Sequence, residues 1–210
     1  MKPALLLAVV CGAGFAAAPF SHREHLEMGL ECSGCHAAAA SSTKADDNLL
    51  PSPQVCRGCH EAGVIPRRPP ALATPVTKFS HALHLQMSSI TAPLIANMID
   101  QGNYLQPALA ANVRSRLSSI NRCEACHRGL EQSDAVTPAA LPNMADCLVC
   151  HAKIDVPWTC EDCHSKTSDL TPPSHKVDHF FDLHSRGTLH LDKTTCAVCH
   201  GREFTCMGCH

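Results

Sequence analysis

A five-residue pattern, Cys-x-x-Cys-His, constrains this chain more than any other feature, because it occurs seven times in 210 residues. The copies use 14 of the 15 cysteines and place a histidine after every cysteine pair. Positions i, i+3 and i+4 share one face of a helical turn, so both sulfurs and the imidazole of a copy point the same way. The copies are numbered here in chain order as motifs 1 to 7: Cys32–His36, Cys56–His60, Cys123–His127, Cys147–His151, Cys160–His164, Cys196–His200 and Cys206–His210.

The pattern is the attachment signature of c-type haem, whose vinyl groups form thioethers with the two sulfurs while the histidine binds the iron. We therefore expect seven covalently attached haem c groups. The predicted attachment cysteines are Cys32, Cys35, Cys56, Cys59, Cys123, Cys126, Cys147, Cys150, Cys160, Cys163, Cys196, Cys199, Cys206 and Cys209. The predicted proximal iron ligands are His36, His60, His127, His151, His164, His200 and His210.

Three other uses of paired cysteines fit the pattern less well. Structural zinc shares one tetrahedral ion between two cysteine pairs, but seven pairs do not divide evenly and zinc does not require the histidine. A disulfide scaffold does not require the histidine either, and the spacing is too tight to close long loops. Redox-active dithiols would occur once or twice in a chain.

The composition indicates that the polypeptide has little core of its own. The chain has one Trp, one Tyr and six Phe against 15 Pro, and seven haems would supply one apolar group for every 30 residues. We therefore predict a mainly α-helical fold with much irregular loop and little or no β-sheet, in which a haem stack forms the core. The chain without haem should be largely unfolded.

The net charge of the chain indicates which kinds of partner it could bind. A formal net charge of −2 argues against nucleic-acid binding. Haem propionates would make the loaded protein more acidic, which favours basic redox partners.

The N-terminus is typical of a secretory signal, which predicts a periplasmic or other extracytoplasmic location. Residues 1–18 contain one lysine and then an uncharged, apolar run. Cleavage after Ala18 or after Ala16 fits this pattern. Two alternatives are a lipid anchor at Cys11 and a segment retained as a membrane anchor, although the apolar run is short for a membrane span. Membrane contact is expected only if the segment is retained.

An internal repeat divides the rest of the chain. Residues 20–26 (Phe-Ser-His-Arg-Glu-His-Leu) match residues 79–85 (Phe-Ser-His-Ala-Leu-His-Leu), and proline-rich joins lie at 65–75 and 170–173. We predict three haem modules: residues 19–78 with two haems, 79–169 with three and 170–210 with two. Motifs 6 and 7 must lie close together, because five residues span at most about 18 Å.

One region resembles ordinary helical protein, and it predicts a helical hairpin at about residues 91–120. Pro93 fits a first turn, Gly102-Asn103 a helix end and Pro107 a second start. The hairpin would cover a haem face or serve as a docking surface. Its predicted buried positions are Leu94, Ile95, Met98 and Ile99 in the first helix, and Leu109, Val113, Leu117 and Ile120 in the second.

Eight of the 15 histidines lie outside the motifs, close to the seven needed as second axial ligands. Single histidines are usually surface residues, but two of these pairs recur in identical frames. We expect ligands at His22, His25, His81 and His84, and also at His175 and His184. The seventh ligand is His179 or His190, and these remain alternatives. Methionine could also bind iron, and it would raise the potential.

The Phe-Ser-His-x-x-His-Leu frames followed by Cys-x-x-Cys-His resemble the cytochrome c3 and c7 group of multihaem cytochromes. The resemblance implies closely packed, bis-histidine haems of low potential with little regular secondary structure. It also implies that the first histidine of a frame, such as His22, binds the haem of its own module and that the second, such as His25, binds a different haem. The doubled motif at the C-terminus resembles other multihaem proteins with paired motifs.

These features predict an electron carrier between redox partners outside the cytoplasm, not an enzyme. The alternatives are a reductase of a small nitrogen compound or oxyanion at one open haem, and a membrane-tethered quinol-oxidising subunit. His210 is both a predicted ligand and the last residue of the sequence. We therefore expect its haem to be an exposed electron-exchange site.

Overall fold

The computed structural model describes residues 20–61, 76–117, 121–135, 137–154, 159–165, 170–186 and 196–200. Predictions that fall on residues 1–19, His190 and motif 7 lie outside this range. The described chain is mainly helical with irregular connections, as predicted. Its only β-structure within these ranges is one isolated antiparallel bridge between Val76 and His164.

Most of the helices are very short, and serine side chains cap two of them, α1 and α4. The hydroxyl of Ser21 accepts from the N–H of Glu24 at 3.2 Å, and Ser80 accepts from Leu83 at the same distance. Helices this short are marginal in isolation, so such caps and tertiary contacts stabilise them. The short α-helices are α1 His22–Glu27, α2 Cys32–Cys35, α3 Pro53–Cys56, α4 His81–Gln86, α8 Phe180–Ser185 and α9 Ala197–His200. The 3₁₀ helices are η1 Ala37–Ala40, η2 Leu130–Gln132, η3 Pro138–Ala140, η4 Cys160–Asp162 and η5 Pro173–Lys176.

The predicted helical hairpin is present, as α5 (Ser88–Asp100) packed against α6 (Pro107–Arg116). Pro107 starts α6 and Gly102 follows α5, as predicted. Gly102 has a φ of +67°, and its N–H donates to the carbonyl of Ile99 at 2.8 Å, which ends the helix. The predicted position of Pro93 in a first turn is wrong. Because α5 begins at Ser88, Pro93 lies inside the helix.

The buried face of the hairpin matches the prediction only in part. Ile95 and Val113 are buried, and Met98, Ile99 and Leu117 pack against them. Leu94 and Leu109 were expected on this face, but both are exposed. Each helix therefore buries a narrower stripe than the apolar sequence pattern implies. Ile120 lies outside the described residues.

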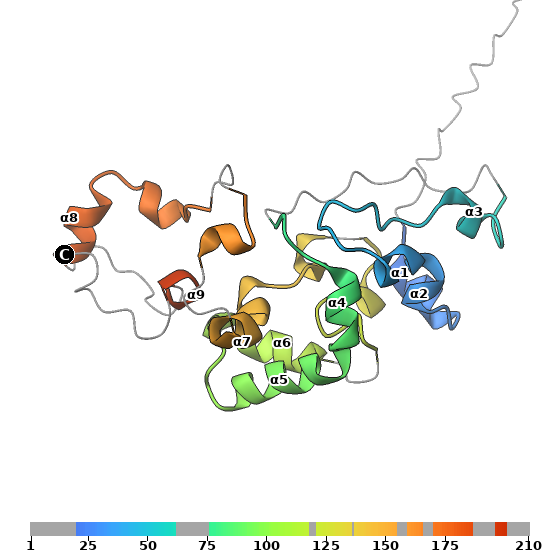
Figure 1. Ribbon diagram of the computed structural model, residues 1–210, viewed down its shortest axis with the longest axis horizontal. Coiled ribbons are helices and arrows are strands. Elements are labelled where there is room, and N and C mark those ends of the chain that lie inside the picture. The colour runs from blue at the N-terminus through green and yellow to red at the C-terminus, as the bar shows by residue number, and fades with distance from the viewer. Residues whose placement is uncertain are drawn as a thin grey trace, which may run out of the picture.

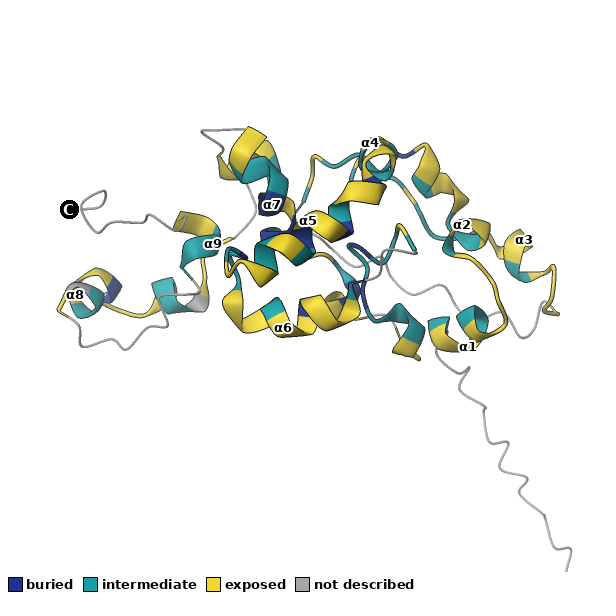
Figure 2. Cartoon of the chain, turned by 90° about the horizontal axis from the view of Figure 1, so that it is seen from below, coloured by how far each residue is buried: buried dark blue, intermediate teal, exposed yellow. Residues whose placement is uncertain are grey.

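The core forms where α7 (Met144–Ile154) packs against α5. Ala145 and Val149 of α7 join Ile95, Val113 and Tyr104 in one buried cluster. Figure 2 shows the buried segments concentrated in this central region, with mostly exposed or half-buried chain on both sides. Motif 4 lies within α7, so this small core positions it.

The helices are spread along the long axis of the molecule, but not in chain order. Figures 1 and 2 both place α3 and α2 at one end, α4 to α7 in the middle, and α9 and α8 at the other end. No helix among the residues described has both the length and the apolar character needed to cross a membrane.

Candidate functional site

Each described motif forms the predicted helical turn. The backbone N–H of the motif histidine donates to the carbonyl of the first motif cysteine at 2.8 Å in motifs 1 and 3, and at 2.9 Å in motifs 2, 5 and 6. Motif 4 lies inside the longer helix α7. The expectation that positions i, i+3 and i+4 share one turn is therefore confirmed for all six described motifs.

Five motif histidines lie opposite a histidine from outside the motifs. The distance between the two ring centroids stays within a narrow range, from 6.0 to 6.4 Å. All six histidines for which the sequence predicted a ligand role most directly are described, and five of them take part. The pairs are His22 with His36, His25 with His60, His81 with His127, His84 with His151, and His175 with His200.

The pairs fall into two classes by the angle between the ring planes. In the first class the rings are nearly parallel, at 11°, 11° and 12° for the pairs of His22, His81 and His175. In the second class they are inclined, at 46° and 39° for the pairs of His25 and His84. Each repeated frame therefore forms one nearly parallel pair and one inclined pair, and His175 in the third module forms a nearly parallel pair.

One phenylalanine in each frame orients both rings. Phe20 meets His22 edge-on at 4.8 Å and stacks on His25 at 4.5 Å. Phe79 repeats these contacts in the second frame at 4.7 Å and 4.3 Å. In the third module, where the sequence spacing differs, Phe180 stacks on His175 and on His184. Such contacts favour one ring plane over others.

Backbone carbonyls determine which nitrogen of several rings stays free. The Nδ1 atoms of His25, His84, His36 and His127 lie 2.7, 2.8, 2.8 and 3.1 Å from carbonyl oxygens. A carbonyl can only accept, so each Nδ1 carries the proton and Nε2 keeps a lone pair. This is the arrangement by which proteins prepare histidines as metal ligands.

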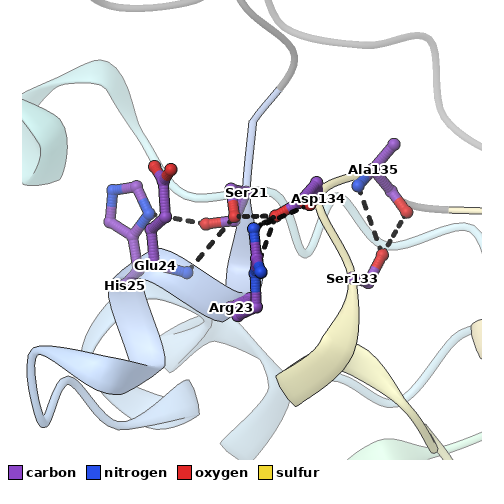
Figure 3. Close-up of polar contacts among 7 residues, drawn as sticks. All are labelled: Ser21, Arg23, Glu24, His25, Ser133, Asp134 and Ala135. Atoms are coloured by element: carbon purple, nitrogen blue, oxygen red, sulfur yellow. Dashed lines mark hydrogen bonds and ion pairs between the residues drawn. The ribbon is translucent and has the colours of Figure 1, made fainter.

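The first frame is held in place by an ion pair with a distant segment. Figure 3 shows Arg23 reaching Asp134, with N–O distances of 3.0 and 2.8 Å, and the Ser21 hydroxyl donating to the same carboxylate at 2.8 Å. The Ser21 hydrogen bond and then Arg23 lower the pKa of Asp134 below its usual value, so it is ionised at neutral pH. Helix α1 is thereby fixed against the chain that follows motif 3.

The surroundings of His22 and His81 favour their neutral form. Burial lowers the pKa of His22, and the neighbouring His36 lowers it further. Burial and then His127 act in the same way on the pKa of His81. Their Nδ1 atoms are buried with no hydrogen-bond partner in the structure, so the orientation of these rings rests on Phe20 and Phe79. A neutral imidazole is the form that binds metals.

The cysteines of the described motifs form no disulfide with one another. All 12 cysteines of the described motifs are free. Burial raises the pKa of Cys126 to about 11 and that of Cys147 to about 12, which favours the neutral thiol. Within the described ranges, no three His, Cys, Asp or Glu side chains are grouped to hold a metal ion by themselves.

The other predicted iron ligands are not seen opposite a second histidine in the contacts described above, or lie outside the described residues. His184 is half-buried, stacks on Phe180 and has its Nδ1 atom 3.2 Å from the carbonyl of Phe181. His179 is exposed, with a left-handed φ of +59° at the start of α8. His164 lies at the bridge to Val76. His190, Cys206, Cys209 and His210 lie outside the described residues.

Sequence reasoning missed a buried polar cluster between motifs 3 and 4. Arg128 follows motif 3 and Asp146 precedes motif 4, and these two residues form a buried ion pair. Tyr104 donates to Asp146 at 2.8 Å, and the Asn143 N–H donates to it at the same distance. Burial and then Asp146 raise the pKa of Tyr104, so its hydroxyl stays protonated. The sequence signal was an ionisable residue directly flanking each motif.

Comparisons of the chain with protein-family models, with curated proteins and with solved structures found no match.

Proposed function

We propose that this protein is a heptahaem c-type cytochrome that carries electrons between redox partners outside the cytoplasm. The observation that carries this proposal is the set of five histidine pairs with ring centroids 6.0 to 6.4 Å apart. Each pair joins a motif histidine to one of the histidines that the sequence predicts as a second axial ligand.

The spacing of the pairs fits one metal ion between two imidazoles. A metal–imidazole bond is about 2 Å long. The ring centre of an imidazole, with bonds of about 1.35 Å, lies about 1.1 Å from its nitrogen. Two metal–nitrogen bonds and two distances from nitrogen to ring centre add up to about 6.3 Å between the ring centroids. Since each pair offers only two protein donors, the remaining ligands of the metal would come from the group that the cysteines attach, which fits haem and not zinc.

In this proposal haem supplies a reversible one-electron couple, and the chain supplies attachment, ligation and orientation. The motif cysteines form the thioethers. The carbonyl groups that bind Nδ1 make the ligating nitrogen more basic, and the phenylalanines set the ring planes. A histidine on both sides of an iron leaves no position for a substrate. Five of the six described motifs have such a partner, which supports an electron carrier over a reductase.

The test is to purify the protein from cells that attach haem in the periplasm. Pyridine haemochrome analysis should give seven haems per chain, and the ferric protein should be low-spin throughout. Clearly fewer than seven haems would overturn the proposal. High-spin haem that binds carbon monoxide in the native reduced protein would favour the reductase instead.

A further inference from the structure

Motifs 1 and 2 are joined through one short helix. His22 and His25 lie one turn apart on α1, and they pair with His36 of motif 1 and His60 of motif 2. Motif 2 is therefore next to motif 1.

Motifs 1 and 3 are neighbours although 86 residues separate them in the sequence. The side-chain amide of Asn121 donates to the sulfur of Cys32 at 3.3 Å, and its oxygen accepts from the N–H of Cys123 at 3.0 Å. One side chain thus contacts the first cysteine of both motifs.

The first two modules interlock around this contact. The α1 frame lies on the segment after motif 3, where the Arg23 N–H donates to the carbonyl of Ser133 at 3.2 Å. The α4 frame lies on the segment after motif 1, where the Ala82 N–H donates to the carbonyl of Ser42 at 2.9 Å. Each frame therefore docks on the other module, with motifs 1 and 3 between them.

Beyond motif 3, the contacts continue toward the other end of the molecule. His81 and His84 on α4 join motifs 3 and 4, as the α1 frame joins motifs 1 and 2. The Arg128–Asp146 ion pair joins the same two motifs. Helix α7 of motif 4 then contacts α9 of motif 6, whose Val198 packs on the central core.

Building on the proposed function, we propose that the electron path does not follow the order of the motifs in the sequence. It runs from motif 2 through motif 1 and motif 3 to motif 4, so motif 2 is the electron-exchange port at the α3 end of the molecule. Figure 1 places α3 at this end, beyond α1 and α2. Cys59 and His60 of motif 2 are exposed, as a port requires.

The surface around this port fits a basic partner. Residues 20–61 contain six carboxylates and three cationic side chains, and Arg23 is already paired with Asp134. The apolar side chains of Met28, Leu30 and Val55 are exposed in the same region. A module with this excess of carboxylates and with exposed apolar side chains would attract a redox protein that presents lysine or arginine around its own centre.

The proposed order of the haems along the electron path can be tested by NMR of the reduced, haem-loaded protein. Haem signals would be assigned through contacts to Phe20 and Phe79 and through a Cys56→Ala/Cys59→Ala variant, which lacks the second haem. We expect nuclear Overhauser contacts between the haems of motifs 1 and 2 and between those of motifs 1 and 3. Contacts between the haems of motifs 2 and 3, with none between those of 1 and 3, would overturn the order.

The same spectra test the charge of the port. The cation hexaamminechromium(III), a paramagnetic probe, should broaden the signals of the second haem at a several-fold lower concentration than those of the haems at motifs 1 and 3. The anion hexacyanochromate(III) is the matched control and should lack this preference. The reverse pattern would contradict the proposal that the redox partner is basic. A protein without haem signals would instead refute the proposed function, whereas haem signals with another contact pattern refute only the path.

Discussion

Where the Nδ1 atom of a histidine is hydrogen-bonded to a backbone carbonyl, that bond leaves Nε2 as the nitrogen that is free to bind a metal. The carbonyl groups of Ser21 and Ser80 hold the second histidine of each frame. The hydroxyl groups of the same two serines cap the helices that carry those histidines. One residue thus starts the helix and orients the histidine. Any residue supplies a backbone carbonyl, so the hydroxyl cap is what favours serine before the first histidine in both frames.

The role of His25 can be tested by removing its ring. In a His25→Ala variant, His60 would be the only protein ligand at motif 2, so one haem in seven should become high-spin. The haem content should not change, because Cys56 and Cys59 still form the thioethers. A His25→Met variant should stay low-spin with a higher potential at that site. Magnetic circular dichroism and haemochrome analysis measure both quantities.

Glu24→Gln is the matched control, since Glu24 is exposed on the same helix. It should leave all haems low-spin. A fully low-spin His25→Ala protein would show that His25 is not a ligand.

The repeated order of pairing assigns a partner to His184. In both frames the first histidine pairs with one motif and the second with the next motif. His175 belongs to the first class and pairs with motif 6, so His184 should serve motif 7. We therefore predict that His184→Ala and deletion of His210 disturb the same haem. The double variant should have one abnormal haem by magnetic circular dichroism, and two would assign His184 to another motif.

The sequence predicted well which histidines lie opposite the motif histidines, because the motifs and the frames have fixed spacings. The cysteine pairs, the motif histidines and the frame histidines could all be read from the pattern. The pairing across modules could not, because it depends on contacts such as that of Asn121 with Cys32, which leave no periodic signal. The buried Arg128–Asp146 pair was also missed, since charged residues are usually exposed.

At the level of helices, the ion pair between Arg128 and Asp146 fixes α7 to motif 3. Both side chains are buried, at 6% and 3% exposure, so neither charge is stabilised by water. Removing one partner of such a pair typically costs about 3–5 kcal/mol, because the other charge stays buried. We expect Asp146→Asn to lower the free energy of unfolding of the haem-loaded protein by about this amount, measured by guanidinium denaturation.

Asp100→Asn provides the matched control. Asp100 pairs with Arg114 through the same chemistry, but their side chains are 55% and 49% exposed. Exposed pairs contribute about 0–1 kcal/mol, so this variant should lose little stability. Equal losses in the two variants would contradict a structural role for the buried pair.

Local sequence rules predicted only part of the hairpin. Its two helices, the helix end at Gly102 and the start at Pro107 follow from local backbone preferences, and they were predicted. The extra turn before Pro93 was not, because α5 continues directly from the end of α4 at Met87. Leu109 is exposed because the core of the described chain is too small to bury every apolar position of α6.

At the scale of the whole molecule, α5, α6 and α7 are the only helices among the described residues that share a buried apolar cluster. That cluster contains Ile95, Tyr104, Val113, Ala145 and Val149. The described residues of the first module have no buried apolar side chain, and Met28, Leu30 and Val55 are exposed there. In this module, order comes from polar contacts such as Arg23 with Asp134 and from the paired histidines, not from an apolar core.

This difference predicts a graded loss of structure when haem is not attached. In the chain produced without haem, amide protons of α1 to α4, α8 and α9 should exchange with solvent without measurable protection, because such short helices are marginal alone. Amides of α5 and α7 should keep weak protection, since their core does not depend on haem. Hydrogen exchange read by mass spectrometry would compare the two forms. Equal protection of all helices in the haem-free chain would mean that the polypeptide folds by its own contacts, and that haem is not needed to hold the end modules together.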